Sequence, residues 1–483
     1  MSSKMLARDR RRNIMRWVRY AGRTVLALLP IVLVVYGVRQ YKFSKRADPP
    51  QPQKAVAVGP QVGTPLFAVR RLPTLVSAPL TTTAIKQKLA TVAAQVPAGS
   101  CLGALADGQV VGAANPETAV IPASTMKIVT AAVALDKLGP DYRFTTNVYG
   151  KLVDGRVTSD LVMVGGGDPV LATPKFRDAS KTFPYYVATP FTALEDIVGQ
   201  LRKKGVRVLN GSLIGDGSRY EGDALLVSWP KSQVSPMGGL VINDTRIRYD
   251  DESYGTDPAK HAVEQLGAIM KDRIVTNGAV SSSGKLPEGL DLLASVQSAP
   301  LKDITAAMLT RSENSIAEML FREIGYKLTG NGSFSSSAQA VTETLMSWGV
   351  PMDGVVIHDG SGLDRGDHLT CQALISILSH GGPSSDLAAG LAVPGKGTLF
   401  DKFLTSAVKD RLRAKTGTLT GVRALAGFVT SSAQHSVTFA LILNSADAEP
   451  RADKLWSVLA DAMASFPQPI DVTPFAPKPV VPG

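Results

Sequence analysis

The sequence predicts an α/β (α+β) protein in which one folded domain is interrupted by a second, mainly β domain. Three observations support this prediction. The folded part opens with a helix and a β-hairpin, and it closes with two strands and an amphipathic helix. Between these ends, from about residue 145 to 300, short strands dominate. A single domain built from both ends of the chain, with an insert between them, accounts for this order.

The opening elements have clear local signals. A helix is expected at "TTTAIKQKLATVAAQ", where a threonine cap precedes apolar residues at helical spacing. The next stretch, "CLGALADGQVV", alternates around Asp107–Gly108, a dipeptide typical of a two-residue hairpin turn. A further helix is expected from Ser124 to "LGP" at 138–140, because glycine and proline end helices.

The middle and the end of the chain follow the same reasoning. Strands are expected in "GRVTSDLVMVGGGDP", "VRVLNGSLIGDG" and "GLVINDTRIRYD", with helices near 191–204 and 258–271. "GGGDP" is expected to be a turn, because it lacks the glycine spacing of a phosphate loop and no helix follows it. Helical spacing returns over 303–327. The strands "VRALAGFVT" and "HSVTFALILN" then precede a helix from Pro450 to about Ser465.

The net charge of +11 is confined to residues 1–46, which hold twelve of the 52 basic and one of the 41 acidic side chains. The rest of the chain carries 40 of each, so nucleic acid is excluded as a partner. The basic residues flank the apolar run "TVLALLPIVLVVYGV". We expect an uncleaved signal anchor with a cytoplasmic N-terminus and an extracytoplasmic body; a cleaved signal peptide and secretion are the alternative.

Composition sets the other boundaries. After the basic tail and anchor at 1–46, residues 47–80 are expected to be a proline-rich linker, and 467–483 a disordered tail. The main domain is predicted to comprise 81–148 and 296–466, and the inserted α/β domain 149–295. Cys101 and Cys371 are expected to be two separate buried thiols, with a disulfide as the alternative.

One helix start places a serine and a lysine in apolar surroundings. In "IPASTMKIVT", Ser124 and Lys127 are three residues apart, so their side chains share one face of a helix. A lysine accepts the proton of a serine only when it is neutral, and burial favours that state by lowering its pKa. Alone, this spacing is weak evidence for catalysis, because a capping serine beside an exposed lysine is more common.

Two further segments strengthen the catalytic interpretation. "LTRSENSIAEML" contains Ser312–Glu313–Asn314 at a helix start, and "RLRAKTGTLTGVRALAG" contains Lys415–Thr416–Gly417 leading into a strand. Together with the Ser124 motif, they follow the order of the three motifs shared by penicillin-binding proteins and class A β-lactamases. Coincidence is a poor explanation for all three motifs at suitable element boundaries.

Over about residues 81–465 the chain resembles the class C low-molecular-mass penicillin-binding proteins. "VGGGDPVL", "HDGSGLDRGDHLT" and "GKGTLFDKF" add to the resemblance. It implies a DD-peptidase/β-lactamase-like catalytic domain, with a central antiparallel sheet flanked by helices and an all-α part. It also implies a D-alanyl-D-alanine carboxypeptidase that acts on peptidoglycan pentapeptides through an acyl-enzyme and is inhibited by β-lactam antibiotics.

The resemblance implies acid–base roles for four residues. Ser124 would be the nucleophile, and Lys127 would be its general base. Ser312 would pass a proton to the leaving amine. Asn314 would hold both Lys127 and the amide of the substrate.

The resemblance also implies a substrate-binding edge. Lys415 would lower the proton affinity of the site. Together with Thr416, Gly417 and Thr418, it would receive the terminal carboxylate of the substrate. The N–H groups of Ser124 and Thr418 would form the oxyanion hole. No metal and no other cofactor is expected.

Other functions remain as alternatives. A D,D-endopeptidase that cuts peptide cross-links would use the same atoms. A β-lactamase is less expected: the glutamates between the second and third motifs, Glu318, Glu323 and Glu343, all follow soon after Ser312, and none stands out as the activator of a deacylating water. We therefore expect slow release of bound penicillin. A non-catalytic wall-binding module is the least expected, because the motif residues are intact.

Overall fold

A computed structural model describes residues 72–181, 189–220, 222–230, 233–246, 255–432 and 435–468. The expected anchor at 24–38, most of the expected linker and the expected tail from 469 onward lie outside these residues. Among the described helices, none is both long enough and apolar enough to cross a membrane.

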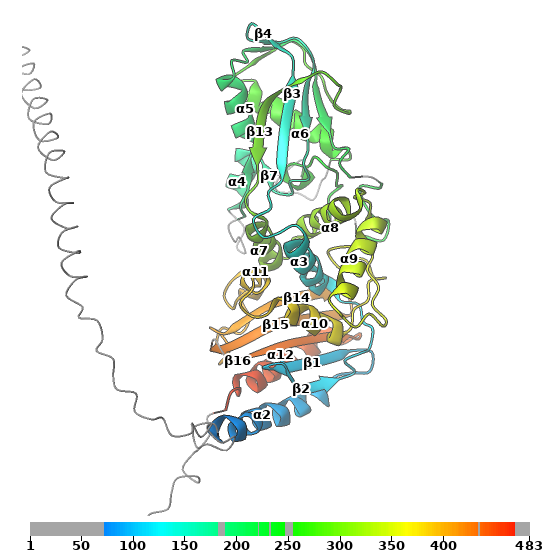
Figure 1. Cartoon of the computed structure of the whole chain (residues 1–483), viewed down its shortest axis with the longest axis vertical. Helices are drawn as coiled ribbons and strands as arrows, with labels where there is room; N and C mark the ends of the chain where they lie inside the picture. The colour runs from blue at the N-terminus through cyan, green and yellow to red at the C-terminus, as the bar shows by residue number, and fades with distance from the viewer. Residues whose placement is uncertain are drawn as a thin grey trace, which may run out of the picture. The chain divides into compact units, whose positions relative to one another are not determined.

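An antiparallel sheet in the order β14-β15-β16-β1-β2 forms the centre of the domain built from both chain ends (Figure 1). The Asp107–Gly108 pair makes the β1–β2 turn with φ of 47° and 79°, as a two-residue hairpin requires. Since β1 pairs with β16 along its length, the two ends of the chain share one sheet. The predicted central antiparallel sheet is confirmed. Its strands are β1 (Cys101–Ala106), β2 (Gln109–Ala114), β14 (Leu412–Leu419), β15 (Val422–Ser432) and β16 (His435–Asn444).

Helices cover both faces of this sheet. On one face, α2 (Leu72–Ala93) and α12 (Ala448–Ala464) enclose one hydrophobic core. On the other face, α3 (Met126–Lys137) and α10 (Cys371–Gly381) enclose a second core. Among the described residues the first helix is α2, which begins at Leu72 rather than at Thr81, so the end of the predicted linker is helical.

The helical part next to the sheet has the helix start that was expected at Ser312–Glu313–Asn314. The helical residues expected over 303–327 form two helices, because Ser312 adopts a left-handed φ of 64° and ends the first of them. This break places Ser312 and Asn314 at the junction of the two helices. The helices of this part are α7 (Leu301–Arg311), α8 (Asn314–Thr329), α9 (Phe334–Ser347) and α11 (Asp386–Gly390).

The inserted segment builds a second sheet in the order β12-β10-β6-β3-β13, with its own core (Figure 1). Two helices pack on it close to the predicted positions, α5 (Leu194–Lys203) and α6 (Pro258–Met270). The strands are β3 (Thr145–Gly150), β6 (Leu161–Val164), β10 (Leu213–Asp216), β12 (Ser281–Ser283) and β13 (Asp291–Gln297). The fold class is therefore confirmed, while the exact domain boundaries stay a prediction.

Smaller elements complete the insert. The prediction of a strand in "GLVINDTRIRYD" is wrong for residues 239–246, the part of this segment that the structure describes. There, Asn243–Thr245 form a 3₁₀ turn in which Asn243 and Asp244 have positive φ. "GGGDP" lies outside any helix or strand, as expected for a turn. The remaining elements are β4 (Leu152–Val153), β5 (Arg156–Val157), β7 (Leu171–Ala172), α4 (Pro174–Ser180), β8 (Thr192–Ala193), β9 (Val208–Leu209) and β11 (Val275–Thr276).

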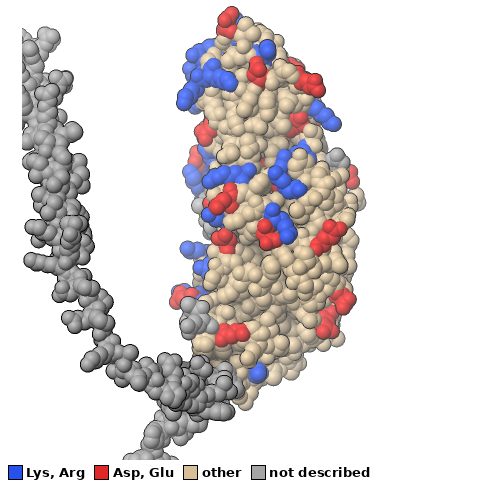
Figure 2. Space-filling model, in the orientation of Figure 1, with Lys and Arg blue, Asp and Glu red and all other residues tan. Residues whose placement is uncertain are grey.

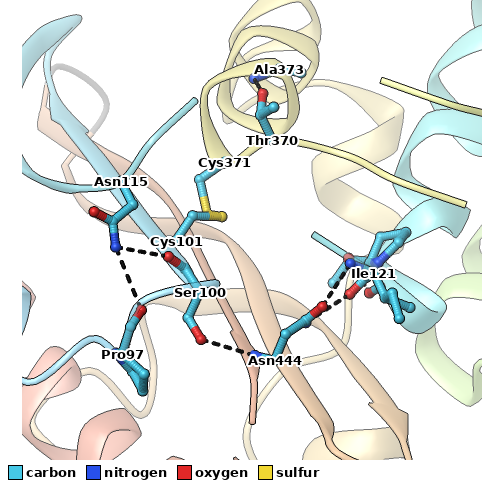
Figure 3. The surroundings of a disulfide bond; sticks show 11 residues. Pro97, Ser100, Cys101, Asn115, Ile121, Thr370, Cys371, Ala373 and Asn444 are labelled. Atoms are coloured by element: carbon cyan, nitrogen blue, oxygen red, sulfur yellow. Dashed lines mark hydrogen bonds between the residues drawn. A yellow bond between two sulfur atoms is a disulfide. The ribbon is translucent and has the colours of Figure 1, made fainter. Parts of the chain in front are cut away.

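Cys101 and Cys371 form a disulfide, so the expectation of two separate thiols is wrong (Figure 3). Cys101 begins β1, Cys371 begins α10, and their Cα atoms are 5.8 Å apart. The helix crosses close above the strand at Gly103, where an added Cβ would lie 2.5 Å from Ile375 Cδ1. The sequence hides this pairing because 270 positions separate the two cysteines.

The charges of the folded body are mixed. Figure 2 shows Lys and Arg side chains interspersed with Asp and Glu over the visible face. This distribution agrees with the equal numbers of basic and acidic side chains outside residues 1–46. That face shows no continuous basic stripe of the kind that follows a nucleic-acid backbone.

Candidate active site

Ser124 lies in a 3₁₀ turn, Ala123–Thr125, that leads directly into α3. Ala123 has a φ of 46°, which is unfavourable for a residue with a Cβ and gives the turn its sharp bend. Asn444, at the end of β16, holds the approach to this turn (Figure 3). Its Oδ1 accepts from the N–H of Ile121 at 2.8 Å, and its Nδ2 donates to the carbonyl of Ile121 at 3.1 Å. The position of Ser124 therefore depends on the sheet as well as on the helix.

The Lys127 side chain is completely buried, and its Nζ has three hydrogen-bond partners. They are Ser124 Oγ at 3.0 Å, Asn314 Oδ1 at 2.7 Å and the carbonyl oxygen of Ser361 at 2.9 Å. Asn314 is oriented by its own Nδ2, which donates to the carbonyl of Gln233. In the neutral amine, the two hydrogens can bond to Asn314 and Ser361, which leaves the lone pair directed at Ser124. This is the geometry that a general base requires.

Burial controls the protonation of Lys127. It lowers the pKa of the ammonium from 10.5 to about 8, although nearby carboxylates oppose the shift. The largest opposing influence is Glu318, followed by Asp359. At neutral pH a useful fraction of Lys127 is therefore neutral.

A loop that sequence reasoning left without a role supplies the Ser361 carbonyl. Glu318, buried in α8, accepts from the N–H of Gly360 at 2.9 Å and from the N–H of Ser361 at 2.7 Å. Gly362 has a φ of 79°, and an added Cβ would lie 1.9 Å from the carbonyl oxygen of Ala123. The loop thus reaches the Ser124 turn only because Gly362 has no side chain.

A second buried carboxylate completes this loop. Asp359 accepts from the N–H groups of Gly362 at 2.6 Å and Asp364 at 2.8 Å, and from the indole N–H of Trp229 at 2.7 Å. Its neighbour Asp367 is also fully buried. Burial, and then the charge of Asp359, raise the pKa of Asp367 to about 11. "HDGSGLDRGDHLT" was the sequence signal for this loop, but residue type alone does not reveal a role for a backbone carbonyl.

A second serine–lysine pair lies at the break between α7 and α8. Lys415, on β14, donates from Nζ to Ser312 Oγ at 2.8 Å and to the carbonyl of Thr416 at 2.7 Å. Burial, and then the charge of Lys127, lower the pKa of Lys415 well below its ordinary value. Because the Ser312 oxygen accepts from Lys415, its own hydrogen is available for another acceptor.

Residues 416–418 form the outer edge of the sheet beside the Ser124 turn. On this edge the N–H of Ala414 bonds to the carbonyl of Ala392 rather than to a neighbouring strand. Alternate residues of a strand direct their N–H groups to the same side, so the N–H of Thr418 also points away from β15. At Gly417 an added Cβ would lie 2.9 Å from the carbonyl of Pro122, which shows how closely the edge approaches the turn.

The structure therefore brings the predicted catalytic side chains into one cluster, and the predicted substrate-binding residues lie along its edge. Direct hydrogen bonds join Lys127 to Ser124 and Asn314, and Lys415 to Ser312. Sequence reasoning missed residues that position this cluster: Glu318, Asp359, Ser361 and Asn444. Among the described residues, no group of three or more His, Cys, Asp or Glu side chains is arranged to hold a metal ion.

Comparisons with known proteins agree with this site. The model of the D-Ala-D-Ala carboxypeptidase 3 (S13) family matches residues 85–250 and 247–462. Carboxypeptidase DacB of Mycolicibacterium smegmatis is 31% identical over 468 residues, covering 91% of this chain and 95% of that protein. A carboxypeptidase of Mycobacterium tuberculosis is 30% identical over 395 residues, covering 76% and 82% of the two chains.

The same fold occurs in penicillin-binding protein 4 of Haemophilus influenzae, with a TM-score of 0.63 and 21% sequence identity. The match covers 77% of this chain and 98% of that one. At this identity the likeness supports the fold alone. The family match and the two mycobacterial relatives carry the assignment further: this chain belongs to the D-Ala-D-Ala carboxypeptidase 3 (S13) family.

Proposed function

We propose that this chain is a serine D-alanyl-D-alanine carboxypeptidase that removes the terminal D-alanine from peptidoglycan pentapeptides. The observation that carries the proposal is the buried Lys127 amine, 3.0 Å from Ser124 Oγ and held by Asn314 and Ser361. Family membership supports the class of substrate.

The first step forms an acyl-enzyme. Neutral Lys127 takes the hydroxyl proton of Ser124, and Ser124 Oγ attacks the carbonyl carbon of the penultimate D-alanine. The N–H groups of Ser124 and Thr418 hold the oxyanion, and one such donor typically contributes about 10²–10³ in rate. The position of Thr418 at the open edge of the sheet supports this role.

Substrate binding itself favours the neutral form of Lys127. The hydrogen-bond partners of the Lys415 ammonium in the described structure are a hydroxyl and a carbonyl, and its pKa is well below the ordinary value. The terminal carboxylate of a substrate, received by Lys415 and the threonines at 416 and 418, would raise the pKa of Lys415 and so stabilise its charged form. The resulting cation would lower the pKa of Lys127 further.

The second step releases D-alanine. Ser312 donates its hydroxyl proton to the leaving amine and regains one through Lys415, which already donates to it. The proton that Lys127 took from Ser124 replaces the one given away, so Lys127 is neutral again. Water then adds to the acyl carbonyl while Lys127 takes one of its protons. Lys127 passes that proton to Ser124 Oγ, and the shortened peptide leaves as an acid that keeps the other proton. This sequence consumes one water molecule and returns every enzyme group to its starting state.

A β-lactam would form the same acyl-enzyme, which we propose to be long-lived. Glu318 has both carboxylate oxygens occupied by backbone N–H groups, so neither is available to activate water. Glu323 is likewise engaged by Arg219, Tyr142 and Tyr220. These contacts argue against a β-lactamase, and the assembled base argues against a non-catalytic wall-binding module.

We also propose that the body is held outside the cytoplasmic membrane by an anchor at 24–38. The charge of +11 in residues 1–46 supports a cytoplasmic N-terminus. The Cys101–Cys371 disulfide supports an oxidising compartment. N-terminal sequencing of the protein from washed membranes separates the two forms: an intact start supports the anchor, and a start after the apolar run supports a cleaved signal and secretion.

The test of the proposed activity is D-alanine release from a synthetic stem pentapeptide. Wild type should release it, and Ser124→Ala should not. Ser347→Ala, an exposed serine at the end of α9, is the matched control and should behave as wild type. Equal release by wild type and Ser124→Ala, or none by wild type, would contradict the proposal.

A further inference from the structure

One segment of the insert packs against the catalytic helices rather than only against its own sheet. We call it the bracing segment; it consists of residues 222–230 and 233–246, between β10 and α6. Trp229, Val234 and Met237 belong to the hydrophobic core that α3 and α8 share, whereas the sheet and helices of the insert enclose a separate core. The bracing segment therefore connects the insert to the two helices that carry the base and its amide partner.

Trp229 fixes the loop behind the general base. Its side chain is 5% exposed, and its ring meets Phe334 of α9 edge to face, with centroids 5.2 Å apart. Its indole N–H donates to Asp359 Oδ2 at 2.7 Å. The same carboxylate accepts from the N–H groups of Ser361 at 3.1 Å and Gly362 at 2.6 Å. Trp229 thus holds the carboxylate around which this loop folds.

The same segment also holds Asn314. The carbonyl of Gln233, four residues after Trp229, accepts from Asn314 Nδ2 at 2.9 Å. Asn314 Oδ1 in turn accepts from Lys127 Nζ at 2.7 Å. The amide of Asn314 is therefore fixed between the bracing segment on one side and the base on the other.

Ser235 anchors the chain next to Gln233. It is fully buried, and its hydroxyl donates to Asp244 Oδ1 at 3.0 Å. Its oxygen also lies 3.3 Å from Ser315 Oγ, in the first turn of α8. The hydroxyl thus ties the bracing segment both to itself and to the helix that presents Asn314.

These contacts converge on the orientation of one amine. The hydrogens of neutral Lys127 bond to Asn314 Oδ1 and to the carbonyl of Ser361, and these two bonds direct its lone pair at Ser124. Gln233 holds the first acceptor directly, and Trp229 holds the second through the loop. A displacement of about 1 Å in such a group costs about 10² in rate.

We infer that the bracing segment orients the general base, with Trp229 as a positioning residue that acts through Asp359 on Lys127. The insert therefore contributes to catalysis, although none of its side chains takes part in the chemical steps. The inference rests on the proposed function and deepens it, because it assigns to the insert the positioning of the base.

The test measures kcat and KM for D-alanine release from a stem pentapeptide, with active sites counted by labelling to completion with a fluorescent penicillin. Trp229→Phe removes the indole N–H and keeps a ring against Phe334. It should lower kcat per labelled site by about tenfold, because it removes a hydrogen bond to a carboxylate, and it should leave KM unchanged. Ser235→Ala should lower kcat per labelled site by about threefold, the effect of a neutral hydrogen bond.

Trp456→Phe is the matched control. Trp456 is 6% exposed, and its Nε1 has no hydrogen-bond partner among the described residues. The same change of side chain should therefore leave kcat per labelled site as in the wild type.

Three results for Trp229→Phe would overturn the inference: an unchanged kcat per labelled site, a loss confined to the number of labelled sites or to KM, or a loss that Trp456→Phe shares. A wild type that releases no D-alanine would contradict the proposed function itself, which distinguishes the two failures. Thermal melting monitors folding, and if Trp229→Phe does not fold, Ser235→Ala decides alone by the same criteria.

Discussion

Single residues control the proton transfers of this site, and two buried lysines are central to them. Burial lowers the pKa of both Lys127 and Lys415 from 10.5. Lys127 retains some proton affinity because Glu318 and Asp359 lie nearby, whereas the partners of Lys415 are a hydroxyl and a carbonyl. In the free enzyme both amines are therefore easier to deprotonate than an exposed lysine, and a ligand carboxylate would raise the pKa of Lys415 again.

The pKa of Lys127 predicts the pH profile of acylation. Since only the neutral amine accepts a proton, the second-order rate of acylation by a penicillin should rise about tenfold per pH unit below pH 7. It should level off above about pH 8, where the folded-state pKa lies. Stopped-flow measurement with a fluorescent penicillin gives this profile. A rate independent of pH from about pH 6 to 9 would show that Lys127 is not the base.

The two aspartates of the loop behind Lys127 should respond differently to the same change. In the wild type, the Asp359 carboxylate accepts from N–H groups. Asp359→Asn places an amide N–H donor against these donors, so it should lower the free energy of unfolding by about 3 kcal/mol. Asp367→Asn should cost less than about 1 kcal/mol, because the raised pKa of Asp367 makes it neutral at pH 7. Urea unfolding at neutral pH measures both. Equal losses would contradict the assigned charge states.

At the scale of elements, short sequence signals predict the turns, helices and strands whose formation depends mainly on neighbouring residues. The Asp107–Gly108 turn and the amphipathic helix near 191–204 were predicted from such signals, and both are present. The helix start at Ser312–Glu313–Asn314 was predicted, but the left-handed conformation of Ser312 that ends the preceding helix was not. A left-handed serine there is tolerated only when the surrounding tertiary structure compensates for it.

Some contacts of the site join elements that are far apart in the sequence, and these contacts explain why part of the site was not predicted. Lys127 and Asn314 are 187 positions apart, and Lys127 and Ser361 are 234 apart. The motif resemblance predicted the first contact, since both partners act through side chains. It did not predict the second contact, since a carbonyl oxygen is present in every residue and its use depends on the fold.

The disulfide is the element-scale feature most open to test. It joins the start of β1 to the start of α10, and it closes a loop of 270 residues. Replacing both cysteines by alanine should lower the free energy of unfolding by about 2–5 kcal/mol. Denaturant unfolding without reductant measures the loss, and thiol titration of the denatured wild type should find no reactive cysteine. Two titratable thiols, with unchanged stability in the variant, would contradict the bond.

At the scale of the whole molecule, the described active site is assembled without the N-terminal region. In chain order, the first residue of the site with a described contact is Ile121, whose backbone bonds to the Asn444 side chain. The other residues of the site lie later in the chain. A protein that starts at residue 72, where α2 begins, should therefore keep the acylation rate of the full chain and lose membrane association. Penicillin labelling of soluble and membrane fractions checks both. A soluble truncated protein that folds but is not labelled would show that residues 1–71 contribute to the site.

The central claim is that Ser124, activated by Lys127, carries the acyl group. Its most direct measurement is the location of the penicilloyl adduct by peptide mass spectrometry after labelling, reduction and trypsin digestion. Cleavage after Lys88 and Lys127 gives the peptide 89–127, and the account predicts the adduct on this peptide at Ser124. An adduct on the peptide 312–322, which contains Ser312, or unchanged labelling of Ser124→Ala, would contradict it.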